Sequence, residues 1–326
     1  MSALPFPAAE RLNILFAHAA YQLGDAFAAR NTGISYHEVR DFAALEAAAP
    51  EADIIVCSGL WRNSLLGGAK KLRFVQSVSA GTDQFDKALF AEHGIRLASG
   101  QGINERAVAE HAIALVLALT RKLHSARDNQ NKRFWRGMIA DPKTREDELG
   151  GKTMVIVGLG RIGSRLARIA KAFDMKVIGV KRDPASGAEA ADEAYHFGAL
   201  PEVVAKADIV VLTCPLTPET TGLMSAAVLA CLQPHALLIN VARGKVVDEA
   251  ALVDALAAKH FAGAGLDVTI EEPLASASPL WEMPQVLITP HTAGETSRYE
   301  SNAIDILLEN LGRLGRGETR LKNEIV

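Results

Sequence analysis

Three polar segments in the second half of the chain hold side chains suited to proton transfer and anion binding. They are 240–244, 265–268 with its continuation 271–274, and 289–294. Each follows an apolar run typical of a buried strand, namely 236–241, 262–268 and 286–288. Taken singly, a histidine after proline, a Glu-Pro pair and an Arg-Gly pair are ordinary loop residues. Taken together at strand ends, where a doubly wound sheet binds ligands, Arg243, Glu272 and His291 become candidate site residues.

A glycine-rich turn, G-L-G-R-I-G at 158–163, provides a second kind of chemistry. A strand-like run precedes it, and an amphipathic helix follows. The apolar face of that helix is formed by Leu166, Ile169, Ala170 and Phe173. Gly158 permits the tight turn, Gly160 lets a pyrophosphate approach the backbone, and Gly163 lets helix and strand pack closely. The helix N-terminus directs free N–H groups at phosphates. With a second strand at 176–180, the turn predicts dinucleotide binding rather than an unliganded loop.

The first hundred residues predict a small domain of their own. Strands are expected at 12–17, 53–57, 74–78 and 95–98. Ser35 and Glu38 form an S-x-x-E capping box, which predicts a helix start. Alternating strands and helices indicate a parallel sheet.

A long helix is expected next, from Glu105 to about Ser125, with Asn104 as its N-cap. Val108, Ala112, Leu115 and Leu119 share one face, and 112–119 is so apolar that we expect it to be buried between domains or against a second subunit. The segments 134–136 and 141–148 follow as a surface excursion. Further strands are expected at 153–157, 176–180, 208–213, 236–241, 262–268 and 286–288, with helices at 249–259 and about 295–314.

These elements predict an α/β protein with two Rossmann-like, doubly wound parallel-sheet domains. The glycine turn lies in the middle of the chain, which indicates that one domain is inserted into the other. We place the inserted dinucleotide-binding domain at 102–292 and the discontinuous domain at 1–101 plus 293–326.

Composition narrows the function classes. The 326 residues are 49% hydrophobic with a net charge of −3, which is typical of a globular protein and argues against nucleic acid or an anionic membrane as partner. The first ten residues lack the basic and apolar regions of a signal peptide, so we expect a cytoplasmic protein. Cys57, Cys214 and Cys231 are scattered without C-x-x-C spacing, which favours reduced thiols, and no metal site is expected.

Taken together, the motifs closely resemble those of the D-2-hydroxyacid dehydrogenase family, in the family's order and over nearly the whole chain. The matching stretches are S-A-G-T-D at 79–83, N-E-R-A-V-A-E-H at 104–111, G-L-G-R-I-G at 158–163, C-P-L-T-P-E-T at 214–220, N-V-A-R-G-K-V-V-D-E-A-A-L at 240–252, L-D-V at 266–268, E-E-P-L at 271–274 and T-P-H-T-A-G at 289–294. The resemblance implies a flavodoxin-like substrate domain with the NAD(P)-binding domain inserted. It also implies hydride transfer between a nicotinamide cofactor and a 2-oxoacid/D-2-hydroxyacid pair, with glyoxylate- or hydroxypyruvate-like substrates favoured, and a homodimer to which the 112–119 helix face is suited.

The resemblance assigns catalysis to Arg243, Glu272 and His291. His291 would transfer the proton, because imidazole gives and takes a proton near neutral pH. Glu272 would orient its ring, and the planar Arg243 fork would clamp the substrate carboxylate and adjacent carbonyl. The backbone N–H groups of Ala80 and Gly81 would hold the carboxylate from the other domain.

The remaining assignments concern the pocket and the cofactor. Leu60 and Trp61 are candidates for the substrate pocket or for packing, and His111 is expected to be a packing residue. Asp267 would face the nicotinamide end of the cofactor. The cofactor-binding set comprises Gly158, Leu159, Gly160, Arg161, Ile162, Gly163, Lys181, Arg182, Cys214, Pro215, Thr220, Val241, Ala242, Asp267, His291 and Ala293.

The end of the strand at 176–180 departs from the NAD pattern. An NAD enzyme places an acidic residue there to bind the ribose 2′-hydroxyl, whereas this chain has Lys181 and Arg182. Two cations would attract a 2′-phosphate, so we predict NADP(H) in preference to NAD(H). The alternatives are that Asp183 serves as the acid, or that the two cations are merely solvated.

Two rival functions are left open. One is a formate dehydrogenase, although those enzymes carry glutamine where this chain has Glu272. The other is a dinucleotide-sensing binding protein of the corepressor kind, which keeps the same polar residues but turns over very slowly.

Overall fold

The computed structural model describes residues 6–8 and 11–326. The chain forms two compact units. Unit 1 comprises the residues up to Asn104 together with Thr296–Val326, and unit 2 is Glu105–Glu295. Unit 1 is therefore built from two separate stretches of the sequence.

Unit 1 contains a five-stranded sheet in which all neighbouring strands are parallel. The strand order is β2-β1-β3-β4-β5, as in flavodoxin-like doubly wound sheets. The strands are β1 (Asn13–Ala17), β2 (Ser35–Val39), β3 (Ile54–Cys57), β4 (Phe74–Ser77) and β5 (Arg96–Ala98). The helices are α1 (Leu23–Ala28), α2 (Phe42–Ala48), α3 (Leu65–Gly68), α4 (Lys87–His93) and α11 (Tyr299–Gly315), with a 3-10 turn at Ala49–Glu51.

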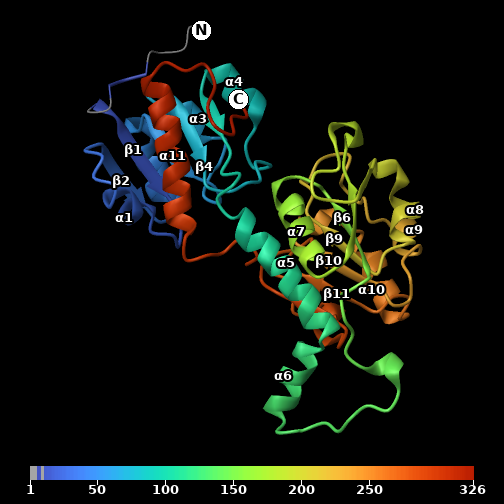
Figure 1. Ribbon diagram of the computed structural model, residues 1–326. Coiled ribbons are helices and arrows are strands. Elements are labelled where there is room, and N and C mark those ends of the chain that lie inside the picture. Colours follow the sequence, from blue (N-terminus) through green and yellow to red (C-terminus); the bar gives the residue numbers. More distant parts are fainter. Residues whose placement is uncertain (1–5, 9–10) are drawn as a thin grey trace. The chain divides into compact units, whose positions relative to one another are not determined.

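Both faces of this sheet are covered by apolar side chains. On one face α1 and α11 lie side by side (Figure 1), and Ile304 and Leu307 of α11 pack into a cluster with Phe16 and Phe27. On the other face Trp61 packs against the rings of Phe85 and Phe90. Trp61 is fully buried in this cluster, so it is a core residue of unit 1.

The C-terminal stretch completes unit 1. The buried Asn310 donates to Oε1 of Gln76 at 2.8 Å, and the Tyr299 hydroxyl donates to the Val78 carbonyl at 2.6 Å. The Leu97 N–H donates to the carbonyl of Val326 at 3.0 Å. The stretch therefore supplies both apolar surface and partners for buried polar groups.

The capping-box prediction is wrong, because Ser35–Val39 forms strand β2 and not the start of a helix. β2 is an edge strand paired in parallel with β1, which leaves its polar residues exposed. Tyr36 packs edge-on against Phe16 and Phe27, and Glu38 accepts a hydrogen bond from the Gly24 N–H at 3.1 Å. Pairing and aromatic packing thus outweigh the local capping preference.

Unit 2 contains a seven-stranded sheet, also parallel throughout. The order is β12-β11-β10-β9-β6-β7-β8. The strands are β6 (Thr153–Val157), β7 (Lys176–Val180), β8 (Glu193–Tyr195), β9 (Ile209–Leu212), β10 (Leu237–Asn240), β11 (Gly263–Leu266) and β12 (Val286–Ile288). The helices are α5 (Glu105–Thr120), α6 (Leu123–Asn131), α7 (Arg161–Ala172), α8 (Leu200–Val204), α9 (Ala226–Leu229) and α10 (Glu249–Ala257). Short 3-10 turns occupy Pro142–Thr144, Pro184–Ser186, Phe197–Ala199, Gly244–Val246 and Pro279–Glu282.

The two parallel α/β sheets confirm the predicted fold class. The sequence did not predict β8, a three-residue edge strand. α5 and α7 cover one face of the unit 2 sheet, and α8, α9 and α10 contribute to the core on the other. The strand order reverses between β6 and β9, at the switch point where doubly wound sheets bind ligands.

Two helix predictions need correction. The long helix ends at Thr120, because Lys122 adopts a left-handed backbone (φ 51°) and α6 starts afresh at Leu123. α7 ends at Ala172, and its buried face consists of Gly163, Leu166, Ala167 and Ala170, while Phe173 is exposed. Phe173 is the C-cap residue, so it lies beyond the packed face of the helix, while Ile169 is half-buried against the same core.

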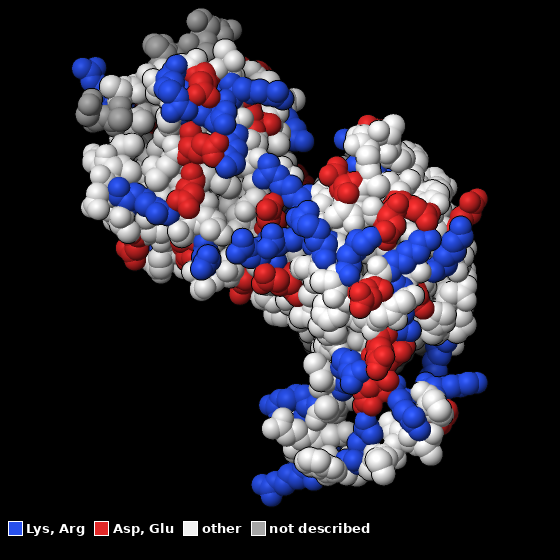
Figure 2. All heavy atoms as spheres, in the orientation of Figure 1, with Lys and Arg blue, Asp and Glu red and all other residues white. Residues whose placement is uncertain are grey.

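The surface carries both signs of charge. Figure 2 shows Lys and Arg interspersed with Asp and Glu over the visible face. No helix in the described part of the chain combines the length and the apolar character needed to cross a membrane.

We predict that the three thiols differ sharply in reactivity. Burial raises the pKa of both Cys57 and Cys214 to about 12, so almost no thiolate forms at these positions at pH 8, whereas Cys231 is partly exposed. Iodoacetamide at pH 8 should therefore add one label to the folded protein, at Cys231, and three after denaturation, as read by mass spectrometry. Cys231→Ser should leave the folded protein unlabelled. Rapid labelling of Cys57 or Cys214 in the folded protein would contradict the prediction.

Candidate active site

The three glycines of the turn after β6 have different surroundings. Gly158 has φ 102°, and a Cβ there would lie 2.5 Å from the Cys214 nitrogen. A Cβ on Gly163 would lie 2.2 Å from the Gly158 carbonyl oxygen, so larger residues would force α7 away from β6. A Cβ on Gly160, by contrast, would have no neighbouring atom within 4 Å. The first and third glycines therefore permit close packing, while the second leaves open space beside the N-terminus of α7. This cradle fits a dinucleotide phosphate.

A hollow beside the turn is lined by Glu105, Leu159, Gly160, Arg161, Ser164, Arg168 and Glu189. Its two arginines suit an anionic ligand, and its two carboxylates give part of the lining the opposite sign. Leu159 is buried beneath it, since its side chain fills the space beside Gly179. Ile162 is half-buried and packs against the α5–α7 core cluster.

The residues after β7 divide into paired and exposed groups. Lys181 is half-buried, with Nζ 3.0 Å from the Gly187 carbonyl oxygen and 3.5 Å from Oε1 of Glu189. Arg182 is exposed. Asp183 accepts the Ala185 N–H at 3.1 Å, which engages its carboxylate in the turn that follows.

The other residues assigned to the cofactor lie in the loops after β9 and β10. Cys214 is buried against Gly158, and Val241 and Ala242 are also buried. The Thr220 hydroxyl donates to the carbonyl of Pro215 at 2.7 Å and accepts from the Thr217 N–H at 2.8 Å. Thr220 therefore ties together the loop that begins at Cys214.

His291 and Glu272 meet at the ends of β12 and β11. Nδ1 of His291 lies 2.6 Å from Oε2 of Glu272, so the ring N–H donates to the carboxylate. The other carboxylate oxygen, Oε1, accepts from the Thr269 N–H at 3.2 Å. The side chains are 46% and 37% exposed respectively, and because Nδ1 bonds Glu272, Nε2 is the ring nitrogen left for a substrate. This is the arrangement that general acid–base catalysis requires.

Arg243 lies in the loop after β10 and is half-buried, with Nη1 donating to the Ala242 carbonyl at 2.8 Å. The buried Asn240 braces this loop: its Nδ2 donates to the Arg243 carbonyl at 3.1 Å, and its Oδ1 accepts from the Ala242 N–H at 3.0 Å. A Cβ on Gly244 would lie 2.0 Å from the Thr269 carbonyl group. Close contact at Gly244 thus brings the loop of Arg243 against the loop that carries Glu272.

Asp267 is a buried residue at the end of β11, and its side chain is only 1% exposed. Its Oδ1 accepts from the Thr289 hydroxyl at 2.6 Å and from the Thr292 N–H at 2.9 Å, while Oδ2 accepts from the Ala293 N–H at 3.0 Å. The carboxylate therefore holds both sides of the loop that carries His291. The family resemblance implied only that Asp267 faces the nicotinamide end of the cofactor and did not reveal this role.

His111 of α5 joins the same cluster. Its Nε2 lies 2.9 Å from the Thr289 hydroxyl oxygen and 3.6 Å from Oδ1 of Asp267. The available signal in the sequence was a lone polar residue on an apolar helix, which did not reveal its partner 178 residues away.

The candidates in unit 1 lie after β3 and β4. Ala80 is exposed, and Leu60 and Gly81 are half-buried. Serine hydroxyls hold the loop of Ala80 and Gly81: Ser99 Oγ donates to the Ala80 carbonyl at 3.0 Å, and Ser79 Oγ to the Gly81 carbonyl at 2.9 Å. The structure thus fixes this loop within unit 1.

Known proteins that resemble this chain identify its family. A family model described as "D-isomer specific 2-hydroxyacid dehydrogenase, NAD binding domain" matches residues 113–293. The chain is 37% identical over 262 residues to D-3-phosphoglycerate dehydrogenase of Mycobacterium tuberculosis, covering 79% of this chain and 48% of that protein. It therefore spans about half the length of that relative.

Two further matches extend over more of the related protein. Glyoxylate reductase of Pyrococcus furiosus is 36% identical over 264 residues, which cover 79% of this chain and 78% of that one. A D-isomer specific 2-hydroxyacid dehydrogenase from Xanthobacter autotrophicus, solved in complex with NADPH and MES, superposes with a TM-score of 0.80 at 29% identity over 98% of both chains. The chain belongs to the D-isomer specific 2-hydroxyacid dehydrogenase family.

Proposed function

We propose that the protein is a nicotinamide-dependent oxidoreductase that interconverts a 2-oxoacid and a D-2-hydroxyacid. The observation that carries this proposal is the His291–Glu272 pair, with its 2.6 Å hydrogen bond, in loops adjoining that of Arg243 at one edge of the sheet. Family membership supports the reaction class, and the D-configuration rests on the family alone.

The protein groups divide the chemical work. Glu272 accepts a hydrogen bond from Nδ1–H of His291, which leaves Nε2 as the atom that gives a proton to the substrate oxygen in reduction and removes it in oxidation. The Arg243 guanidinium would bind the substrate carboxylate and polarise the neighbouring carbonyl. The bound cofactor would supply or receive the hydride.

We assign dinucleotide binding to unit 2 and carboxylate binding to the Ala80–Gly81 loop of unit 1. The open space at Gly160 and the arginines of the adjoining hollow support the first assignment. The serine-braced loop of Ala80 and Gly81 supports the second, because a rigid backbone loses little entropy when its N–H groups bind an anion. Small 2-oxoacids such as glyoxylate and hydroxypyruvate are the first substrates to test. The next is D-3-phosphoglycerate, the compound in the name of the mycobacterial relative.

NADP(H) remains our preferred cofactor. Asp183 is already engaged with the Ala185 N–H, which favours the cations over Asp183 as the group that reads the ribose. Glu189 partly neutralises Lys181, so Arg182 would contribute more to binding a 2′-phosphate.

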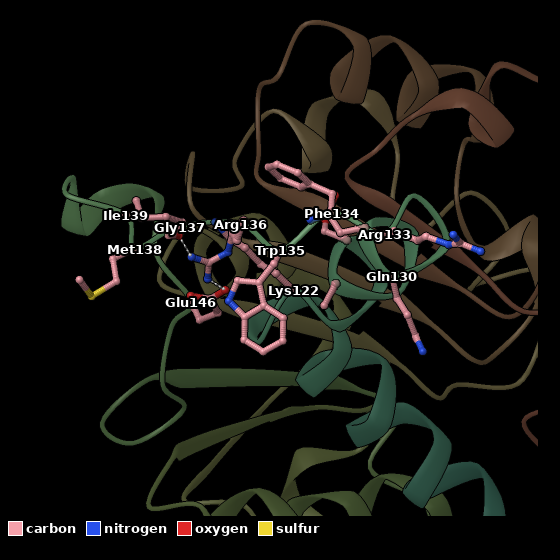
Figure 3. A pocket seen from close by; sticks show the side chains of 13 residues that line it. Lys122, Gln130, Arg133, Phe134, Trp135, Arg136, Gly137, Met138, Ile139 and Glu146 are labelled. Carbon is pink, nitrogen blue, oxygen red and sulfur yellow. Dashed lines mark hydrogen bonds and ion pairs between the residues drawn. The ribbon is translucent and has the colours of Figure 1, made fainter.

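We also propose a homodimer, but through a different surface from the one the sequence suggested. Ala112, Leu115 and Leu119 are buried against the sheet and α7 of their own unit, so this stripe is already covered. The segment 123–146, here named the arm, instead has no buried residue in α6. Together with Lys122 it forms a hollow in which Phe134, Trp135, Met138 and Ile139 lie among polar and charged side chains such as Arg136 and Glu146 (Figure 3). Trp135 is 96% exposed and Met138 is fully exposed. A second copy would cover these side chains, since a two-fold interface pairs one patch with itself.

The first prediction from the proposed function concerns proton transfer. His291→Gln should lower kcat by about 10²–10⁴-fold because no other group replaces the proton donor, while dinucleotide binding changes little. Stopped-flow turnover and fluorescence titration with the dinucleotide would measure the two effects. His260→Gln, which alters an exposed histidine bonded to the Ala230 carbonyl, is the matched control. Retention of most activity in His291→Gln would disprove the assignment.

The second prediction concerns the cofactor. Changing Lys181 to Asp and Arg182 to Ala together should lower the NADPH/NADH ratio of kcat/KM by about tenfold or more, because charge-assisted bonds to the 2′-phosphate are lost. Glu189→Gln should move the ratio the other way by freeing Lys181. Lys176→Ala, at the opposite end of β7, is the control. An unchanged ratio would refute the 2′-phosphate proposal.

The third prediction concerns assembly. Replacing Trp135 and Met138 with Glu should convert a dimer into a monomer of 34.8 kDa, because charges would be buried in the apolar interface. Sedimentation velocity would show the change. Trp281→Glu, at another exposed tryptophan, should remain dimeric. A wild-type monomer, or a dimer that survives the arm changes, would exclude this interface.

Turnover assays distinguish the proposed function from its two rivals. A dinucleotide sensor would bind the cofactor yet reduce glyoxylate, hydroxypyruvate and larger 2-oxoacids very slowly. A formate dehydrogenase would oxidise formate instead. Side-by-side assays with NADPH and NADH distinguish all three.

A further inference from the structure

We propose that His111 is a positioning residue for the loop that carries His291. It bonds the Thr289 hydroxyl, which in turn bonds the buried carboxylate of Asp267. The role in catalysis rests on the function proposed for His291. The arrangement of the three side chains does not, because it follows from the geometry of unit 2 alone.

Counting protons fixes the direction of each hydrogen bond. The Thr289 hydroxyl has a single proton, and at 2.6 Å it is donated to Oδ1 of Asp267. The contact of 2.9 Å between that hydroxyl oxygen and Nε2 of His111 must then be donated by the ring nitrogen. His111 therefore carries a proton on Nε2, and it prevents the hydroxyl from rotating away from Asp267.

Asp267 transmits this constraint to the backbone of His291 and of the two residues that follow it. Its side chain accepts the N–H groups of Thr292 and Ala293, and its own carbonyl accepts the His291 N–H at 2.8 Å. His291 adopts φ 55°, a left-handed conformation that is uncommon for a residue with a Cβ. The three N–H bonds to Asp267 stabilise it here.

The scaffold beneath His111 is rigid. α5 is packed against α7 and the sheet through Val108, Ala112 and Leu115, the residues flanking His111 on the buried side of the helix. The ring itself is partly exposed, with 23% of its side-chain surface accessible. The His111 ring, held by a helix that is packed on the sheet, can thus orient the Thr289 hydroxyl without touching the reacting atoms.

Two pairs of variants separate this role from simple packing. His111→Gln keeps an N–H donor near the position of Nε2, and His111→Met keeps similar bulk without a donor. Thr289→Ser keeps the hydroxyl, and Thr289→Val keeps the shape without it. We expect Met and Val to lower kcat by about tenfold or more, with smaller changes in KM and dinucleotide affinity, and Gln and Ser to restore most of the loss. His235→Met, which removes the hydrogen bond between an exposed histidine and Asp208, should leave kcat unchanged.

A double-mutant cycle tests the connection itself. If His111 acts through Thr289, the His111→Met/Thr289→Val double variant should lose little more activity than either single variant. Multiplicative losses would overturn the proposal. So would unchanged kcat in His111→Met, or equal losses in His111→Gln and His111→Met accompanied by a lowered Tm.

The protonation of the ring gives a test that needs no turnover. Long-range ¹H–¹⁵N correlation spectra of the unmodified protein, with the His111 signals assigned through His111→Gln, should show a proton on Nε2. A neutral ring protonated on Nδ1 alone would overturn the proposal even in an active enzyme. If no 2-oxoacid or formate is turned over but Nε2 carries the proton, the proposed function fails while the hydrogen-bonded chain stands.

Discussion

The candidate active site depends on how a carboxylate is accommodated inside unit 2. A buried carboxylate is costly unless its oxygens are hydrogen-bonded, and Asp267 obtains its donors from the very loop that carries His291. Satisfying the buried group and placing the acid–base residue are therefore one structural requirement. The loop cannot move away from β11 without leaving Asp267 short of donors. This links the stability of the sheet edge to the geometry of the site.

The parallel sheet then gathers the remaining groups. Arg243, Glu272 and His291 follow three adjacent strands, β10, β11 and β12, so their loops emerge at one edge even though 48 residues separate the first from the last by number. Close contact does the finer positioning. At Gly244 the backbone approaches Thr269 within a distance no side chain could share, and Thr269 in turn donates to Glu272. Close packing therefore positions the loop of Arg243 against Thr269, and a hydrogen bond from Thr269 then positions Glu272.

The sequence predicted those features that depend on strong local patterns. Apolar runs located most strands, and the glycine turn located the phosphate cradle of unit 2. It failed where tertiary contacts outweigh local preference: the Ser35 capping box lies in an edge strand held by Tyr36 packing, and the predicted long helix breaks at Lys122. It could not connect His111 with Thr289, because a hydrogen bond between distant positions leaves no periodic signal. Nor could it show that α5 buries its apolar stripe within its own unit.

The split of unit 1 across the sequence has a consequence for synthesis. As the chain leaves the ribosome, β1 to β5 are synthesised long before α11. Their later partners are still missing at that stage: Asn310 for Gln76, Ile304 for Phe16, and Val326 for the edge of β5. Unit 2 is continuous and can close on itself during that interval. Of the two sheets, the one whose strands are synthesised first is thus the last to have all of its partners. Until then its apolar face is open to chaperones, or to the same face of a neighbouring nascent chain.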